Sequence, residues 1–148
     1  MRLIARYFTA LLAIAVSEAG QPLSPQLLIP RAGKPPILEV IEGGLAITGF
    51  RQRDPHDGAP VSRDTTAYLS YDDNTLYIAF VCKDNPAEVR ANFAKRDDVL
   101  DNDLVGIYLD TFHDRQRAYF FFANPLGVQV DGIRTEGKDD DLSFDTVW

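Results

Sequence analysis

The chain has 148 residues, of which 45% are hydrophobic and 25% charged, a composition typical of one globular domain. Its 22 acidic and 15 basic side chains give a net charge of −7, which argues against nucleic acid as a partner because nucleic acid is itself a polyanion. A single cysteine excludes an internal disulfide and a four-cysteine metal site.

The first 19 residues have the pattern of a secretory signal peptide. Arg2 and Arg6 precede an apolar run at residues 7–16. Small residues at Ser17 and Ala19 permit cleavage before Gly20. The run is too short to cross a bilayer. We therefore expect an exported protein, located in the periplasm, at the outer membrane or outside the cell.

The remainder reads as a linker followed by a domain. Residues 20–36 are rich in proline and predict an extended linker, and the domain is expected to occupy residues 37–148. Its first strand is predicted between Ile37 and Ile47. Turn-forming residues from Phe50 to Pro60 then predict a loop.

The clearest strand pattern begins at residue 67. Strands are predicted at residues 67–71 and Leu76–Cys82, joined by a turn at residues 72–75. In the second of these strands, alternate residues from Leu76 to Cys82 form one apolar face. Cys82 on this face is expected to be buried and unreactive.

The second half of the chain continues the same pattern. Asp84-Asn85-Pro86 predicts a short helix or turn through Phe93. Three further strands are predicted at residues 105–110, 118–123 and 128–133, and the middle one is expected to be central because it is apolar on both faces. A last strand is predicted to begin at Phe144.

Short strands with short connections predict an all-β protein, an antiparallel β-sandwich of jelly-roll type. Because Trp148 falls inside the last predicted strand, we expect the sandwich to be truncated at its C-terminal strands and a further domain to follow.

The sequence offers little for catalysis, so we expect a binding domain and no catalytic residues. A G-x-S-x-G motif is absent, and His56 and His113 lie in charged, turn-rich segments typical of the surface. A carboxylate pair of the glycosidase kind stays open, because the sequence does not show the separation of such groups.

Aspartates are the other candidates for chemistry. Asp97, Asp101, Asp103 and Asp131 are the best candidates for a structural calcium site, since calcium prefers oxygen ligands from loops. The alternative is ordinary solvated charge, as we expect for the acidic run at residues 139–141. No cofactor is expected to be required.

Seven short motifs at residues 50–148 resemble the family 9 carbohydrate-binding modules, in the version at the N-terminus of large secreted or outer-membrane-associated bacterial proteins. The motifs are F-x-Q-x-x-P from Phe50, T-x-x-x-x-Y-D from Thr66, L-Y-I from Leu76, K-R-D from Lys95, L-D-T-F-x-D from Leu109, N-P-x-G-V-Q-x-D from Asn124 and D-x-V-W from Asp145.

The resemblance implies a β-sandwich that binds polysaccharide or oligosaccharide, often holds structural calcium, and serves carbohydrate catabolism by an attached glycoside hydrolase. One alternative is a non-catalytic docking domain of an outer-membrane β-barrel protein. It arises because the chain has one tryptophan, where sugar-binding members of the family pair two. Another is a hydrolase domain.

Four residues are the expected ligand-binding set. Gln52 and Arg96 occupy motif positions and can hydrogen-bond vicinal hydroxyls, while Tyr71 and Trp148 lie at predicted strand ends and can stack on a sugar ring. The structural alternative is that Arg96 pairs with a neighbouring aspartate, Asp97 or Asp103, and that Trp148 packs in the core.

Overall fold

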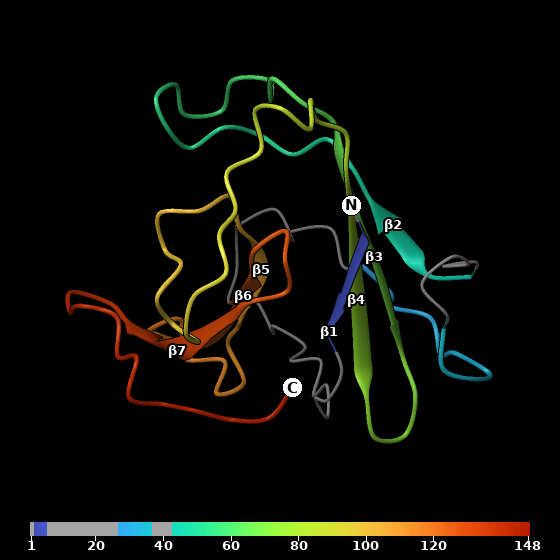
Figure 1. Ribbon diagram of the computed structural model, residues 1–148. Coiled ribbons are helices and arrows are strands. Elements are labelled where there is room, and N and C mark those ends of the chain that lie inside the picture. Colours follow the sequence, from blue (N-terminus) through green and yellow to red (C-terminus); the bar gives the residue numbers. More distant parts are fainter. Residues whose placement is uncertain (1, 6–26, 37–42) are drawn as a thin grey trace, which may run out of the picture.

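The computed structural model describes residues 2–5, 27–36 and 43–148, which form two antiparallel β-sheets (Figure 1). The sheets have the strand orders β1-β4-β3-β2 and β5-β6-β7. The strands are β1 (Arg2–Ala5), β2 (Leu45–Ile47), β3 (Thr65–Tyr71), β4 (Leu76–Cys82), β5 (Val105–Leu109), β6 (Arg117–Ala123) and β7 (Gln129–Thr135). The predicted all-β sandwich is therefore confirmed.

The two sheets meet through an apolar core. Buried side chains of β3 and β4, among them Leu69 and Ile78, pack against Ile107 and Leu109 of β5. Because side chains alternate between the two faces of a strand, β5 directs these two residues toward the other sheet. Burial of this face provides the main drive for the sheets to associate.

The outer face of the second sheet carries its own core. Phe120 and Val130 are almost completely buried there beneath Val99 of the long connection between β4 and β5. Strand β6 is thus covered on both faces and lies between β5 and β7. The prediction of a central strand at residues 118–123 is confirmed.

The short helix or turn predicted through Phe93 is a turn at residues 86–88, which agrees with the prediction. One predicted strand differs from the structure. Residues 144–148 form no strand; instead they run along the inner side of the second sheet, where the ring of Phe144 lies 4.9 Å from that of Tyr119. Side-chain contacts, rather than the backbone hydrogen bonds of a sheet, hold this segment in position.

Part of the predicted linker belongs to the sandwich. Ala32 N–H donates to the Tyr71 carbonyl at 2.7 Å, and Tyr71 N–H donates to Pro30 at 3.2 Å. Of the predicted signal peptide, the structure describes residues 2–5 alone, as β1 beside β4. The other residues of that segment, and residues 37–42 of the first predicted strand, lie outside the described residues.

The described ranges contain no helix that is long and apolar enough to cross a membrane.

Asp72 fixes the turn between β3 and β4. Its carboxylate accepts the backbone N–H groups of Asn74 and Thr75 at 2.9 Å and the Tyr77 hydroxyl at 2.6 Å. The Tyr77 hydroxyl contributes most, followed by the Asn74 N–H, and together they hold the pKa of Asp72 below its ordinary value of 3.8.

We therefore expect acid to destabilise the fold partly through Asp72. A carboxyl with a lowered pKa in the folded state stabilises the protein above its unfolded pKa, and this contribution disappears as the pH falls through the folded value. Thermal melts between about pH 5 and pH 2.5 should show a weaker pH dependence for Asp72→Asn than for the parent chain. Asp73→Asn is the matched control, because Asp73 receives none of these three hydrogen bonds; equal slopes in all three proteins would contradict the prediction.

Candidate functional site

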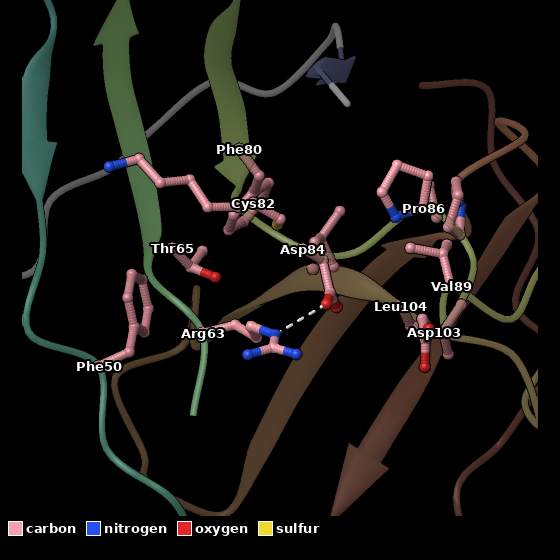
Figure 2. Close-up of a pocket in the computed structure, with 15 residues that line it drawn as sticks. Phe50, Arg63, Thr65, Phe80, Cys82, Asp84, Pro86, Val89, Asp103 and Leu104 are labelled. Carbon is pink, nitrogen blue, oxygen red and sulfur yellow. Dashed lines mark hydrogen bonds and ion pairs between the residues drawn. The ribbon is translucent and has the colours of Figure 1, made fainter. Parts of the chain in front are cut away.

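A cleft of about 600 Å³ opens between the two sheets at one end of the sandwich (Figure 2). The start of β3 and the end of β4 form one wall, and the start of β5 and the end of β6 form the other. The cleft lies within the size range of small-molecule sites. Its lining comprises Phe50, Arg63, Thr65, Phe80, Cys82, Lys83, Asp84, Pro86, Val89, Asp103, Leu104, Val105, Gly106, Ala123 and Pro125.

The inner end of the cleft is apolar. A small void of about 20 Å³ adjoins the cleft between the sheets, and Trp148 is one of the residues that line it. The void and the cleft share four lining residues: Phe80, Val105, Gly106 and Ala123. Phe80 and Val105 direct their side chains inward from facing strands, so the void and the inner cleft are continuous with the sandwich core.

Charged groups surround the opening. Arg63 Nε donates to Asp84 Oδ1 at 3.1 Å, and its Nη2 donates to Glu88 at the same distance. These hydrogen bonds, first that to Asp84, raise the pKa of Arg63 further above its ordinary value, so the guanidinium stays cationic. Asp103 is held separately by Arg90, through both the backbone N–H and the guanidinium.

Phe50 stands on one side of the Arg63–Asp84 pair, while Pro86 and Val89 stand on the other (Figure 2). Phe50 is 37% exposed. The cleft thus combines an accessible aromatic face with donors and acceptors of both charges, an arrangement suited to holding a neutral polyhydroxylated ligand.

Cys82 differs from its prediction. It is half-buried and lines the cleft, so the thiol is not enclosed in the core. The apolar face of β4 is the predicted one. Cys82, however, is the last residue of the strand and lies at the edge of the sandwich, where this face opens into the cleft.

Gln52 and Tyr71 lie apart from each other. Gln52 Nε2 donates to the Pro60 carbonyl at 2.9 Å, which closes the loop after β2. Tyr71 packs half-buried against the core at the opposite end of β3 from Thr65, the residue that lines the cleft.

Arg96 and Trp148 do lie near each other, since both bond to the Gln129 side chain of β7. The Arg96 guanidinium pairs with Asp131, which is fully buried, and Nη2 also donates to the Thr146 carbonyl at 2.6 Å. Trp148 packs edge-on against Phe121 at 5.3 Å. Trp148 thus packs between the sheets, and Arg96 pairs with Asp131 and Asp145 rather than with the aspartates nearest to it in sequence.

The four predicted ligand residues therefore occupy three separate places, and none of them lines the cleft. The structure draws attention to Phe50, Arg63, Asp84 and Asp103 instead. Phe50 is the first residue of the F-x-Q-x-x-P motif. The three charged residues are marked by position, since they stand just before β3 and β5 and just after β4. Antiparallel pairing and the packing of the sheets bring these three strand ends together.

The predicted calcium ligands do not converge. Asp131 is paired with Arg96, Asp103 with Arg90, and Asp101 accepts from Asn102 at 2.8 Å. Asp97 accepts the Asp131 backbone N–H at 3.1 Å. Nowhere in the described part of the chain are three Asp, Glu, His or Cys side chains grouped to hold a metal ion. The residues present therefore do not fit a calcium site in this arrangement.

No family model, curated protein or solved structure matches the chain.

Proposed function

We propose that the chain is a non-catalytic carbohydrate-binding domain of an exported protein. The observation that supports this proposal is the cleft, which is lined by the partly exposed aromatic residue Phe50 and by the charged pair of Arg63 and Asp84. The sequence resemblance to family 9 carbohydrate-binding modules points to the same class of ligand.

The chemistry of a sugar matches the opening of the cleft. One face of a pyranose ring is lined by C–H groups and stacks on an aromatic ring, while its hydroxyls both donate and accept hydrogen bonds. Phe50 would provide the aromatic surface. The carboxylates of Asp84 and Asp103 would accept hydroxyl protons, and Arg63 would donate to hydroxyl oxygens.

The biological role follows from the same resemblance. A domain that holds polysaccharide or oligosaccharide keeps an attached glycoside hydrolase close to its substrate, which raises the effective concentration of that substrate. We propose that the protein acts in the periplasm, at the outer membrane or outside the cell.

Xylo- and cello-oligosaccharides are therefore expected to bind, and Phe50→Ala should weaken binding about tenfold through loss of the stacking face. Isothermal titration measures the affinity. Phe112→Ala is the matched control, because this ring is also exposed but lies on the β5–β6 connection, at the opposite end of the sandwich from the cleft. Equal affinities of the two variants would place the sugar elsewhere.

The second candidate is a docking domain in an outer-membrane β-barrel protein. The position of Trp148 favours it, because the only tryptophan of the sequence is half-buried and packs edge-on against Phe121 instead of standing free for stacking. Absence of binding at millimolar oligosaccharide in the folded parent protein would favour this candidate over the first.

A further inference from the structure

We propose that the ligand of the cleft is a saccharide that carries an aromatic substituent, with the sugar at the opening and the aromatic group in the inner end. This inference rests on the proposed carbohydrate-binding function and specifies the chemical class of its ligand.

The cleft changes character with depth. At the opening, the side chains of Arg63 and Lys83 are 52% and 77% exposed, and those of Asp84 and Asp103 are more than one-third exposed. At the inner end, Ala123 is 2% exposed and lies beside its cross-strand neighbour Val105, while Phe80 lines the cleft from the other sheet. Polar partners are therefore concentrated at the opening.

The decrease in polarity with depth determines where each part of the ligand would bind. A sugar hydroxyl that enters the inner end loses its hydrogen bonds to water and meets apolar side chains, which costs free energy. An aromatic ring in the same place loses only unfavourable contact with water. A bare oligosaccharide would leave the inner end empty of favourable contacts, whereas an aryl glycoside satisfies both regions.

Two wall residues favour a flat ring in particular. The half-buried thiol of Cys82 borders the cleft and is a polarisable neighbour for an aromatic edge, and the ring of Phe80 offers a second aromatic contact. The cleft volume of about 600 Å³ is large enough for a ligand of this size class.

The test compares methyl β-glucoside, phenyl β-glucoside and phenol by titration into the full chain. We expect the phenyl glucoside to bind at least tenfold more tightly than either of the other two. Equal affinity of the methyl and phenyl glucosides would overturn this inference and leave the proposed function standing. If phenol binds as tightly as the phenyl glucoside, the sugar contributes nothing and the inference also fails. Absence of binding by all three, and by the oligosaccharides, would remove the proposed function itself.

Alkylation of Cys82 gives an independent readout in the unaltered protein. Because this thiol lines the cleft, a bound aryl group should slow its reaction with iodoacetamide at least fivefold, while methyl glucoside should leave the rate unchanged. Cys82→Leu would place a bulkier side chain in the same region and should remove the preference for the phenyl glucoside over the methyl glucoside. The melting temperature of this variant shows whether it is folded. Equal protection by both glucosides would contradict the assigned depth of the aromatic group.

Discussion

Replacing Asp131 with alanine should lower the free energy of unfolding by about 3 kcal/mol, which corresponds to a fall in melting temperature of roughly 10 °C. Asp131 has no solvent exposure and accepts from the Arg96 guanidinium and, at 3.0 Å, from the Thr146 backbone N–H. The substitution leaves a partly buried guanidinium without its main partner and releases one attachment of the C-terminal segment. Thermal and urea denaturation measure the effect.

Asp140→Ala is the matched control. Asp140 also pairs with an arginine, at 3.2 Å from Arg134, but both side chains are more than one-third exposed. A surface pair of this kind contributes at most about 1 kcal/mol. If the two alanine variants melt at the same temperature, the Asp131 pair does not anchor the segment.

A double-mutant cycle separates the pair from the cavity left by the side chain. Arg96→Met alone leaves the Asp131 carboxylate buried without its cation, so both single variants should be costly. The combined variant removes both charges together, and we expect its destabilisation to be smaller than the sum of the two. Strict additivity would show that Arg96 and Asp131 act independently.

The fold was largely predictable because its strands are encoded locally. Apolar residues alternate clearly along β4, and the strand follows a turn in which the Asp72 carboxylate accepts two backbone N–H groups. The bounds of β4 could therefore be predicted from neighbouring residues. Strand β6 is apolar on both faces, and such a pattern requires cover on both sides. Nothing beyond a short window of sequence is needed for either inference.

The last residues were predicted wrongly as a strand for the opposite reason. Thr146 and Trp148 have strand-forming character, but their backbones bond to the side chains of Asp131 and Gln129 in β7, the preceding strand, instead of to a strand backbone. Local propensity does not distinguish a backbone that joins a sheet ladder from one that lies across a sheet face.

The candidate site was harder to predict than the fold. Arg96 stands beside two aspartates in sequence, yet its principal partner is 35 positions away. The cleft is assembled from the ends of strands in two sheets, and its depth depends on how those sheets pack. Of the motif residues, Arg96 holds the C-terminal segment to β7, whereas Phe50 lines the cleft, so a motif position does not by itself distinguish the two roles.

Gly106→Ala should cost at least about 2 kcal/mol, because the second sheet has no room for a side chain at this position. Gly106 pairs with Phe122 across β5 and β6, and the Phe122 ring lies over it. An added Cβ would overlap that ring and come within 2.5 Å of the Phe121 carbonyl oxygen. Either the ring must leave the outer core or the two strands must move apart.

Two further variants, Gly33→Ala and Phe122→Ala, test whether the cost of Gly106→Ala comes from the clash with the Phe122 ring. Gly33→Ala should be close to neutral, since a Cβ at Gly33 meets no atom within 4 Å. Phe122→Ala removes the ring, so in that background Gly106→Ala should lower the free energy of unfolding by less than it does in the parent chain. The part of the cost that persists measures the clash with the Phe121 carbonyl. Urea denaturation of the parent chain, the three single variants and the double variant measures these costs. An undiminished cost of Gly106→Ala in the Phe122→Ala background would mean that the glycine prevents separation of the strands rather than displacement of the aromatic ring.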